Sequence, residues 1–296
     1  MTAAERRAFW SDYQPGFRAA AALVGTSEFF DEVSVKRYAL EPHISDLVAF
    51  DGWQGRAILE AGCGIGTDGA RFAAGCANYT GLDFSPAALA LAQRRFELER
   101  LPGRFVAGSA TALPFEDNTF DLVFSHGVIH HLPDTDVAVR EFHRVLKPGG
   151  TVVAMVYHRQ SLNYHVTIML VRRAAIGMLL LPKAPPVVAR LTGEREEVLA
   201  GHRRLLSTRG FRYLRDRDLF LSHNTDGPGN PLSKVYSRAE AERLFAPFVN
   251  VTTEVRYLNL RLYPGGLALS RTRIALALER RVGWHLYVRG TKGQAD

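Results

Sequence analysis

The sequence predicts an α/β fold: a Rossmann-like, doubly wound sheet of seven mostly parallel strands, with helices before it and a helical insertion after the fifth strand. Short apolar runs alternate with helical stretches from Ala57 to Tyr157, at the spacing of βαβ units. A glycine-rich loop follows the first apolar run. The alternation stops after Tyr157 and resumes near Ser237, which indicates an insertion within the sheet domain.

The first 50 residues are expected to form two or three helices. Trp10, Tyr13 and Phe17 recur at helical spacing, and a second periodic stretch, residues 29–50, is interrupted by Pro42. We interpret residues 1–50 as an N-terminal helical lid.

Residues 51–158 are predicted to form the core of the sheet. "AILEA" is a continuous apolar run, as expected for a strand buried on both faces. A helix is expected over residues 67–74, then the strand "ANYTGLD", and then a helix that has Ser85 as its N-cap and Pro86 in its first position. The strands "RFVAG", "FDLVFS" and "GTVVAMVY" follow, with a helix over residues 134–146 capped by Asp134.

Two segments complete the chain. Residues 159–236 contain no convincing strand and are expected to form a helical insertion that covers the acceptor. Residues 237–296 are expected to supply the last helix, with a capping box of Ser237 and Glu240, and the last strands, "VNVTTEVRYL" and "GWHLYVRG".

The charge is unevenly distributed. Residues 1–150 hold 14 Lys and Arg against 19 Asp and Glu, whereas residues 151–296 hold 23 against 11. The basic half is compatible with an anionic acceptor, a membrane surface, nucleic acid or a solvated arginine-rich surface. The two cysteines, Cys63 and Cys76, have no metal-binding spacing, so we expect no metal and a reducing, cytoplasmic setting.

The glycine loop indicates a nucleotide-containing ligand. Its glycines stand at positions 62, 64 and 66, whereas a dinucleotide fingerprint would place the third at position 67, which is Thr67. No Gly-Lys-Ser/Thr follows, which excludes a Walker A loop. Asp83 ends the second strand and can bind ribose hydroxyls, in NAD and in S-adenosylmethionine alike. Glu60, beside the loop, favours a ligand that carries a cationic amine.

Four segments in order, "LEAGCGIGTD", "YTGLDFSP", "ALPFEDNTFDLVFSHGVIHHLPD" and "RVLKPGG", resemble the motifs of class I S-adenosylmethionine-dependent methyltransferases. They are most similar to the branch that includes ubiquinone and menaquinone biosynthesis methyltransferases. The resemblance covers residues 57–157 and implies S-adenosylmethionine as the cofactor.

The resemblance also implies the cofactor contacts. The methionine half would be lined by Glu60, Gly62, Cys63, Gly64 and Gly66. Asp83 would hold the ribose and Phe84 would pack on the adenine. The family's Gly-Asp-Ala is here Gly108-Ser109-Ala110, so Ser109 and Ala110 would meet the adenine without the usual carboxylate. Ser125 and His126 would face the sulfonium.

Methyl transfer from a sulfonium needs a base only when the acceptor must lose a proton. Candidate groups should lie after the carboxyl ends of the strands, where such sheets bind ligands. They are His126, His130, Tyr157, His158 and, in the loop "FLSHNTDGPGNP", Asp226. His158 is the leading candidate, and His131 is interpreted as a core histidine.

The insertion bears on the acceptor. "HVTIMLVRRAAIGMLLLP" is apolar nearly all round except at Arg172 and Arg173, which makes it unsuited to span a bilayer. It is interpreted as a lid helix, an interfacial helix on an anionic membrane or an ordinary buried helix. We expect a small, lipophilic or anionic acceptor such as a quinone, isoprenoid, polyketide or aromatic precursor.

Two other functions stay open. The basic half would suit an RNA or protein methyltransferase, but it lacks regularly interleaved aromatic residues, so nucleic acid is not the expected partner. The second open function is that of a protein with the same fold that binds the cofactor but transfers no methyl group. The sequence leaves the oligomeric state open.

Overall fold

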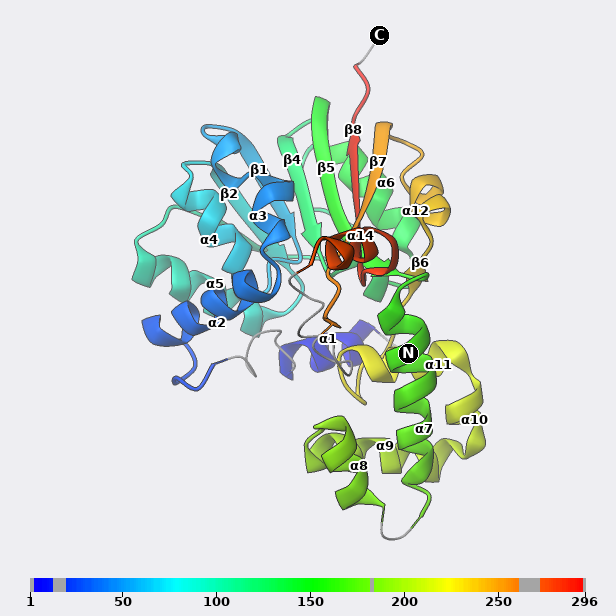
Figure 1. Cartoon of the computed structure of the whole chain (residues 1–296). Helices are drawn as coiled ribbons and strands as arrows, with labels where there is room; N and C mark the ends of the chain where they lie inside the picture. Colours follow the sequence, from blue (N-terminus) through cyan, green and yellow to red (C-terminus); the bar gives the residue numbers. More distant parts are fainter. Residues whose placement is uncertain (1–2, 13–19, 182–183, 261–271, 295–296) are drawn as a thin grey trace.

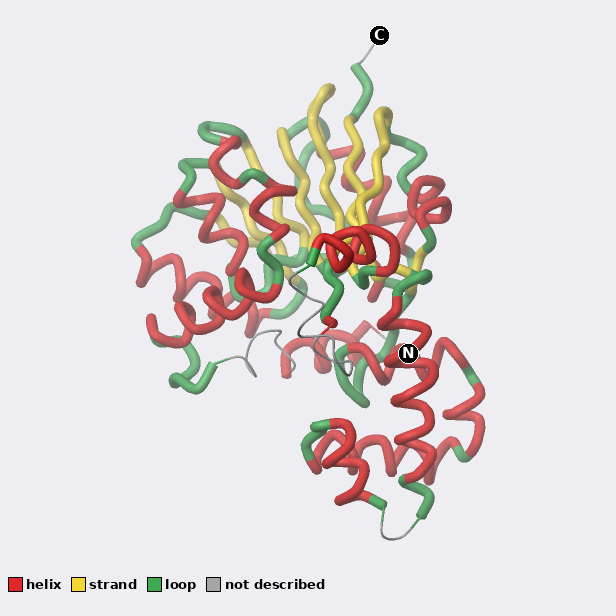
Figure 2. Tube along the Cα trace, viewed as in Figure 1, coloured by secondary structure: helices red, strands yellow, loops and turns green. Residues whose placement is uncertain are grey.

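The computed structural model describes residues 3–12, 20–181, 184–260 and 272–294 (Figure 1). The predicted helical positions Tyr13 and Phe17 lie outside these ranges. A twisted sheet forms the centre of the larger lobe, with helices on both of its faces (Figure 2).

The sheet confirms the predicted class. Its strands run in the order β3-β2-β1-β4-β5-β8-β7, and β6 pairs with β5. All pairs are parallel except those of β8 with β5 and β7. The bounds are β1 (Ala57–Ala61), β2 (Asn78–Asp83), β3 (Arg104–Ala107), β4 (Phe120–His126), β5 (Leu146–His158), β6 (Val235–Tyr236), β7 (Val249–Arg256) and β8 (His285–Thr291). The two-residue β6 is the one strand not expected, in a segment predicted to lack strands.

The strand order creates a crevice where ligands can bind. From β1 the chain proceeds to β2 on one side of it, and then to β4 on the other. The loops after β1 and β4 therefore diverge at the carboxyl edge, which is the usual ligand position in such sheets.

Helices from the N-terminal half cover one face of the sheet. They are α2 (Ser27–Leu40), α3 (His43–Val48), η2 (Phe50–Trp53), α4 (Thr67–Ala74) and α5 (Pro86–Glu99). Ile44 of α3, Phe72 of α4 and Phe96 of α5 share one buried cluster with Ile58 and Phe124 of the sheet. Because apolar residues point to both faces of β1 and β4, the sheet is buried on both sides.

The opposite face is covered by α6 (Thr135–Val145) and α12 (Arg238–Leu244), while η3 (Ile129–His131) follows β4. Phe142 of α6 and Phe245 after α12 are fully buried against the strands. The caps at Ser85 and Ser237 are confirmed, the latter with Glu240 as a complete capping box. Asp134 precedes α6 but makes no side-chain capping bond, which corrects its expected role.

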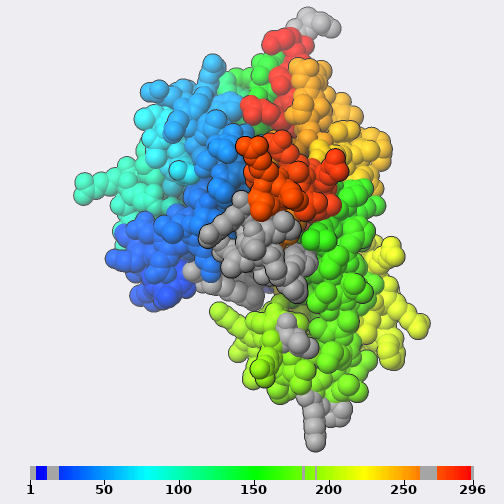
Figure 3. All heavy atoms as spheres, in the orientation of Figure 1, coloured from blue at the N-terminus to red at the C-terminus, as the bar shows by residue number. Residues whose placement is uncertain are grey.

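The insertion forms a second, helical lobe below the sheet domain (Figure 3). Its helices are η4 (Asn163–Arg172, a π-helix), α7 (Arg173–Met178), α8 (Pro185–Thr192), α9 (Glu196–Arg209), α10 (Phe211–Arg215) and α11 (Arg217–Thr225). Tyr164, Tyr213 and Phe220 build its own core, which reaches Trp284 at the sheet. Among the described residues, no helix is both long enough and apolar enough to cross a bilayer.

Two terminal helices complete the structure. α14 (Arg273–Val282), absent from the sequence prediction, precedes β8. α1 (Ala3–Asp12) lies between the two lobes, below the carboxyl ends of the strands (Figure 1).

Candidate active site

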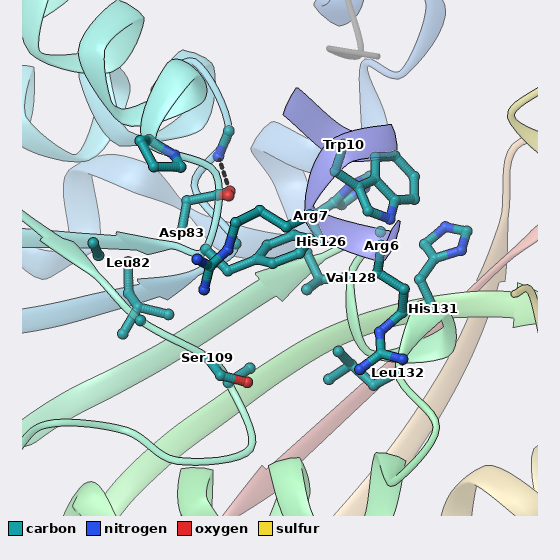
Figure 4. A pocket seen from close by; sticks show the side chains of 18 residues that line it. Arg6, Arg7, Trp10, Leu82, Asp83, Ser109, His126, Val128, His131 and Leu132 are labelled. Atoms are coloured by element: carbon teal, nitrogen blue, oxygen red, sulfur yellow. Dashed lines mark hydrogen bonds between the residues drawn. The ribbon is translucent and has the colours of Figure 1, made fainter. Parts of the chain in front are cut away.

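A cavity of about 350 Å³ opens at the carboxyl edge of the sheet, at the crevice that the strand order creates. Its walls come from the segments after β1, β2, β3 and β4, and Arg6, Arg7 and Trp10 of α1 cover it (Figure 4). The volume is in the range of small-molecule sites.

The glycine loop brings backbone to this cavity. Gly62 has φ +87°, and a Cβ built there would lie 2.3 Å from Val128 Cγ2, so no side chain fits. Gly64 has φ +52°, but nothing lies within 4 Å of its built Cβ. Gly62 is therefore fixed by packing, whereas Gly64 leaves open space for a ligand to approach the backbone.

Asp83, at the end of β2, holds the loop in place. Its Oδ2 accepts a hydrogen bond from Gly64 N at 2.9 Å (Figure 4). Its Oδ1 accepts a second one from Ser85 N, also at 2.9 Å. Burial raises the pKa of this carboxyl above its ordinary value. Each oxygen keeps a lone pair, so the carboxylate can also accept from two neighbouring ligand hydroxyls.

Residues after β2 and β3 form the wall beside Asp83. Phe84, Ser109 and Ala110 all line the cavity. Ser109 Oγ lies 2.8 Å from Thr111 Oγ1, so part of its hydrogen-bonding capacity is used within the loop. This wall offers apolar contacts and one hydroxyl, which suits a flat heterocycle.

A second cavity, of about 270 Å³, lies along the same loop, and Gly62, Gly64 and His126 line both. Lys36 and Arg37 contribute cations to the second cavity, and Glu60 and Asp68 contribute carboxyl groups. Charges of both signs suit the two ends of an amino acid. The two cavities together suit a nucleoside joined to an amino acid.

Glu60 and Cys63 line this second cavity, as expected for residues near the methionine half. Tyr79 Oη donates to Glu60 Oε2 at 2.6 Å. Burial, followed by the nearby charge of Asp68, raises the pKa of Glu60 well above its ordinary value, and burial likewise raises that of the Cys63 thiol. A cationic amine beside Glu60 would restore its ionised form.

Two expected contacts do not line either cavity. Ser125 is fully buried, and its hydroxyl donates to the Ala61 carbonyl at 2.9 Å, across to the neighbouring strand β1. Gly66 precedes α4, and its built Cβ would lie 3.2 Å from Ala92 of α5. Ser125 thus ties two strands together and Gly66 allows two helices to pack, and their expected cofactor roles stay predictions.

The cavity beside Asp83 has a second end. Trp10, His131 and Leu132 lie on the side away from Asp83, and His126 and Val128 lie between (Figure 4). The rings of Trp10 and His131 are 4.7 Å apart. When a ligand is bound at Asp83, this end of the cavity remains free to bind a second molecule.

His131 connects this end to a buried polar cluster. Its Nδ1 donates to the Leu232 carbonyl at 2.7 Å, and its Nε2 lies 3.5 Å from Asp226 Oδ2. Tyr157 Oη donates to Asp226 Oδ1 at 3.3 Å, and the His130 ring lies 3.9 Å from the Tyr157 ring. Three predicted candidates thus meet in one cluster, but its member at the cavity is His131, which the sequence interpretation assigned to the core.

His126, at the end of β4, belongs to a different cluster. Its Nε2 lies 2.8 Å from Tyr287 Oη, which also lies 3.2 Å from His43 Nε2. Glu41 Oε2 lies 3.5 Å from His126 Nε2 and 3.4 Å from His285 Nδ1. Burial is the main cause that lowers the pKa of all three histidines, to about 4 for His43 and about 3 for His285.

His158, the leading candidate for the base, belongs to neither cluster. It is buried, its Nδ1 donates to the Gly283 carbonyl at 3.0 Å, and it lines neither cavity. It anchors the start of β8. The expected catalytic role of His158 stays a prediction that neither cavity supports.

Comparison with known proteins adds independent evidence for residues 59–154, which match the family described as "Methyltransferase domain". A probable phthiotriol/phenolphthiotriol dimycocerosates methyltransferase of Mycobacterium ulcerans (strain Agy99) is 42% identical over 99 residues, 32% of this chain and 37% of that protein. The fatty-acid O-methyltransferase of Mycolicibacterium smegmatis (strain ATCC 700084 / mc(2)155) is 38% identical over 119 residues, 39% of this chain and 42% of that protein. The match therefore spans less than half of the length of these relatives.

Among solved structures, the [4+2]-cyclase SpnF superposes with a TM-score of 0.50 and 16% sequence identity. The match covers 96% of this chain and 87% of that one. At this identity the likeness concerns the fold alone, and it includes the additions around the sheet.

Proposed function

We propose that this protein, whose residues 59–154 form a methyltransferase domain of the class I S-adenosylmethionine-dependent family, transfers a methyl group from S-adenosylmethionine to a small lipophilic acceptor. The observation that carries the proposal is the division of the 350 Å³ cavity, with Asp83 at one end, Trp10 and His131 at the other, and His126 between. Such a site aligns a donor and an acceptor, which is most of what methyl transfer requires.

The donor would lie along the glycine loop. Asp83 would accept from the ribose hydroxyls, Phe84 and Ala110 would contact the adenine, and the amino-acid part would extend into the smaller cavity beside Glu60. The sulfonium would then lie near Gly62, Gly64 and His126, the residues that both cavities share.

The acceptor would occupy the end formed by Trp10, His131 and Leu132, next to Val128. This wall is aromatic and aliphatic, with the Arg6 side chain beside Leu132 (Figure 4). It suits an apolar molecule that carries a polar or anionic group. The names of the two relatives, which refer to phthiotriol dimycocerosates and to fatty acids, agree with a lipophilic class.

Two groups can receive a proton from an acceptor hydroxyl. Burial lowers the pKa of His131 and, more strongly, of His126, which leaves both imidazoles neutral near pH 7. Asp226 lies 3.5 Å from His131 Nε2 and would stabilise the imidazolium once it forms. We favour His131, because it stands in the acceptor end of the cavity.

The test is a transfer assay with methyl-labelled S-adenosylmethionine and a panel of fatty acids, phenols and hydroxylated lipids. His131→Asn should lower kcat at least tenfold without changing the affinity for S-adenosylhomocysteine, and His158→Asn is the matched control that should keep near-normal kcat. Cofactor binding with no transfer to any acceptor of the panel would instead favour a non-methylating protein. Failure to bind the cofactor would overturn the proposal altogether.

If the protein contacts an anionic membrane, a lipophilic acceptor dissolved in that membrane could enter the site from it. Leu170, Val171, Leu180 and Leu181 of the insertion are between 51% and 63% exposed, and the half of the chain that carries them is basic. Exposed aliphatic side chains in a basic segment are typical of interfacial contact.

A further inference from the structure

The cluster around Glu41 has a composition that methyl transfer by itself does not require. Glu41, His43 and His285 each offer one ligand atom, and these atoms all lie within 4.8 Å of one another. Glu41 follows α2, His43 begins α3 and His285 begins β8, so the cluster is assembled from both ends of the chain.

Two buried atoms of the cluster make no hydrogen bond among the described residues, although ion-pair distances connect them to each other and connect Glu41 to His126. They are Glu41 Oε2 and His285 Nδ1, which lie 3.4 Å apart. His285 is only 5% exposed. Leaving buried polar atoms unpaired is costly, so such atoms in a folded protein point to a missing ligand.

We propose that Glu41, His43 and His285 bind a divalent transition-metal ion, of the zinc, cobalt or iron(II) class. Imidazole nitrogens with one carboxylate oxygen suit these ions, whereas magnesium and calcium select sites built from oxygen alone. A tetrahedral ion with bonds of about 2.1 Å has ligand atoms about 3.4 Å apart. The 3.4 Å separation of Glu41 Oε2 and His285 Nδ1 agrees with that value.

The surroundings hold the ligands in the required form. Arg37 Nη1 lies 3.9 Å from Glu41 Oε1, which leaves Oε2 for the ion, while Arg37 itself is paired with Asp68. Tyr287 Oη contacts His43 Nε2, and the Tyr257 ring stacks on His285 at 4.5 Å. Hydrogen bonds and packing of this kind orient the imidazoles of metal sites.

Three protein ligands leave a coordination position open. His126 Nε2 lies 3.5 Å from Glu41 Oε2, so this position lies toward His126, which lines both cavities. The metal site itself does not rest on the proposed function.

The test uses the full-length protein, stripped with a chelator and titrated with Co²⁺ and Zn²⁺. Wild type should bind one equivalent, with a d–d absorption band for Co²⁺ that is typical of low-symmetry nitrogen and oxygen coordination. Glu41→Gln and His285→Gln should weaken the affinity at least 100-fold. His165→Gln, which replaces an exposed histidine of the insertion, is the matched control and should bind as wild type does.

Thermal unfolding without metal is the control for misfolding. A variant that no longer binds the ion but keeps the wild-type Tm has lost the ligand and not the structure. If Glu41→Gln proves unstable, His285→Asn is used in its place. The proposal would be overturned if the wild-type protein bound no stoichiometric ion. It would also be overturned if both ligand variants bound the ion as tightly as the wild type does. The affinity for S-adenosylhomocysteine, measured on the same samples, keeps this result distinct from a failure of the proposed function.

Discussion

The loop glycines provide a sharp test of how this site is built, because Gly62 and Gly64 should fail for different reasons. At Gly62, φ is +87° and a Cβ would lie 2.3 and 2.8 Å from the two γ-carbons of Val128. At Gly64, φ is +52° and a Cβ would meet no protein atom within 4 Å. Gly62→Ala should therefore damage the fold, and Gly64→Ala should mainly damage ligand binding.

The magnitudes follow from two separate costs. A side chain in the left-handed region costs about 1–2 kcal/mol, and forcing a methyl group into a packed site costs about 1–3 kcal/mol more. Gly62→Ala should then lower the free energy of unfolding by about 2–5 kcal/mol, a large part of the about 5–15 kcal/mol typical of a protein. Gly64→Ala carries only the first cost, about 1–2 kcal/mol.

Urea unfolding followed by circular dichroism measures both values, and calorimetry with S-adenosylhomocysteine measures the affinity. Val128→Ala removes the two γ-carbons and should recover part of the stability lost in Gly62→Ala, but not all, because Val128 Cβ would remain 3.1 Å away. If Gly62→Ala unfolds at the wild-type urea concentration, or if Val128→Ala gives no recovery, the packing argument is wrong. Wild-type affinity in Gly64→Ala would refute the position assigned to the donor.

Three further predictions address the donor, the pH dependence and the membrane. Asp83→Asn, which keeps the size of the side chain, should weaken the binding of S-adenosylhomocysteine at least tenfold in calorimetry, because the charge facing the ribose is lost. Burial lowers the pKa of His202 to about 3, so the unfolded chain binds more protons than the native one between about pH 6.5 and 3. Stability to urea should therefore fall as the pH is lowered through this range, by up to about 1.4 kcal/mol per pH unit for such a histidine, and His202→Gln should flatten the slope. Leu180→Asp should reduce flotation with anionic vesicles at low salt, and a wild type that does not float would remove the membrane contact.

The part of the site that the sequence could predict is the part that short-range patterns encode. Two consecutive strand–loop–helix units contain the predicted features, and within such units periodicity and turn chemistry are informative. The first unit holds the apolar run before Gly62, and the second holds the acid at position 83 and the Ser85 cap. The structure places Glu60, Asp83 and Phe84 at the cavities accordingly. Local patterns could not predict the orientation of the Ser125 side chain, because it depends on which carbonyl of a neighbouring strand accepts its hydroxyl.

The clusters could not be predicted because they depend on long-range packing. His43 and Tyr287 are 244 positions apart in sequence, yet 3.2 Å separate Nε2 from Oη. No local pattern distinguishes His131, at the cavity, from His130, which is fully buried beside it. The strand β6 was missed for a related reason: two residues carry no periodicity, and their pairing depends on the position of β5.

The division between donor and acceptor residues limits what the relatives can tell about this protein. The family match ends at residue 154, and it includes the glycine loop, Asp83, His126 and His131. Trp10, Glu41, Asp226 and His285, which build the acceptor end and the candidate metal site, all lie outside it. Similarity within residues 59–154 therefore informs us about the donor site and about the groups after β4. The choice of acceptor depends on segments outside this range, for which the match to the relatives gives no information. Exchanging residues 3–12, which carry Trp10, for the corresponding segment of a relative should for that reason change which acceptor is methylated, and leave the affinity for S-adenosylhomocysteine within about tenfold, which is about 1.4 kcal/mol.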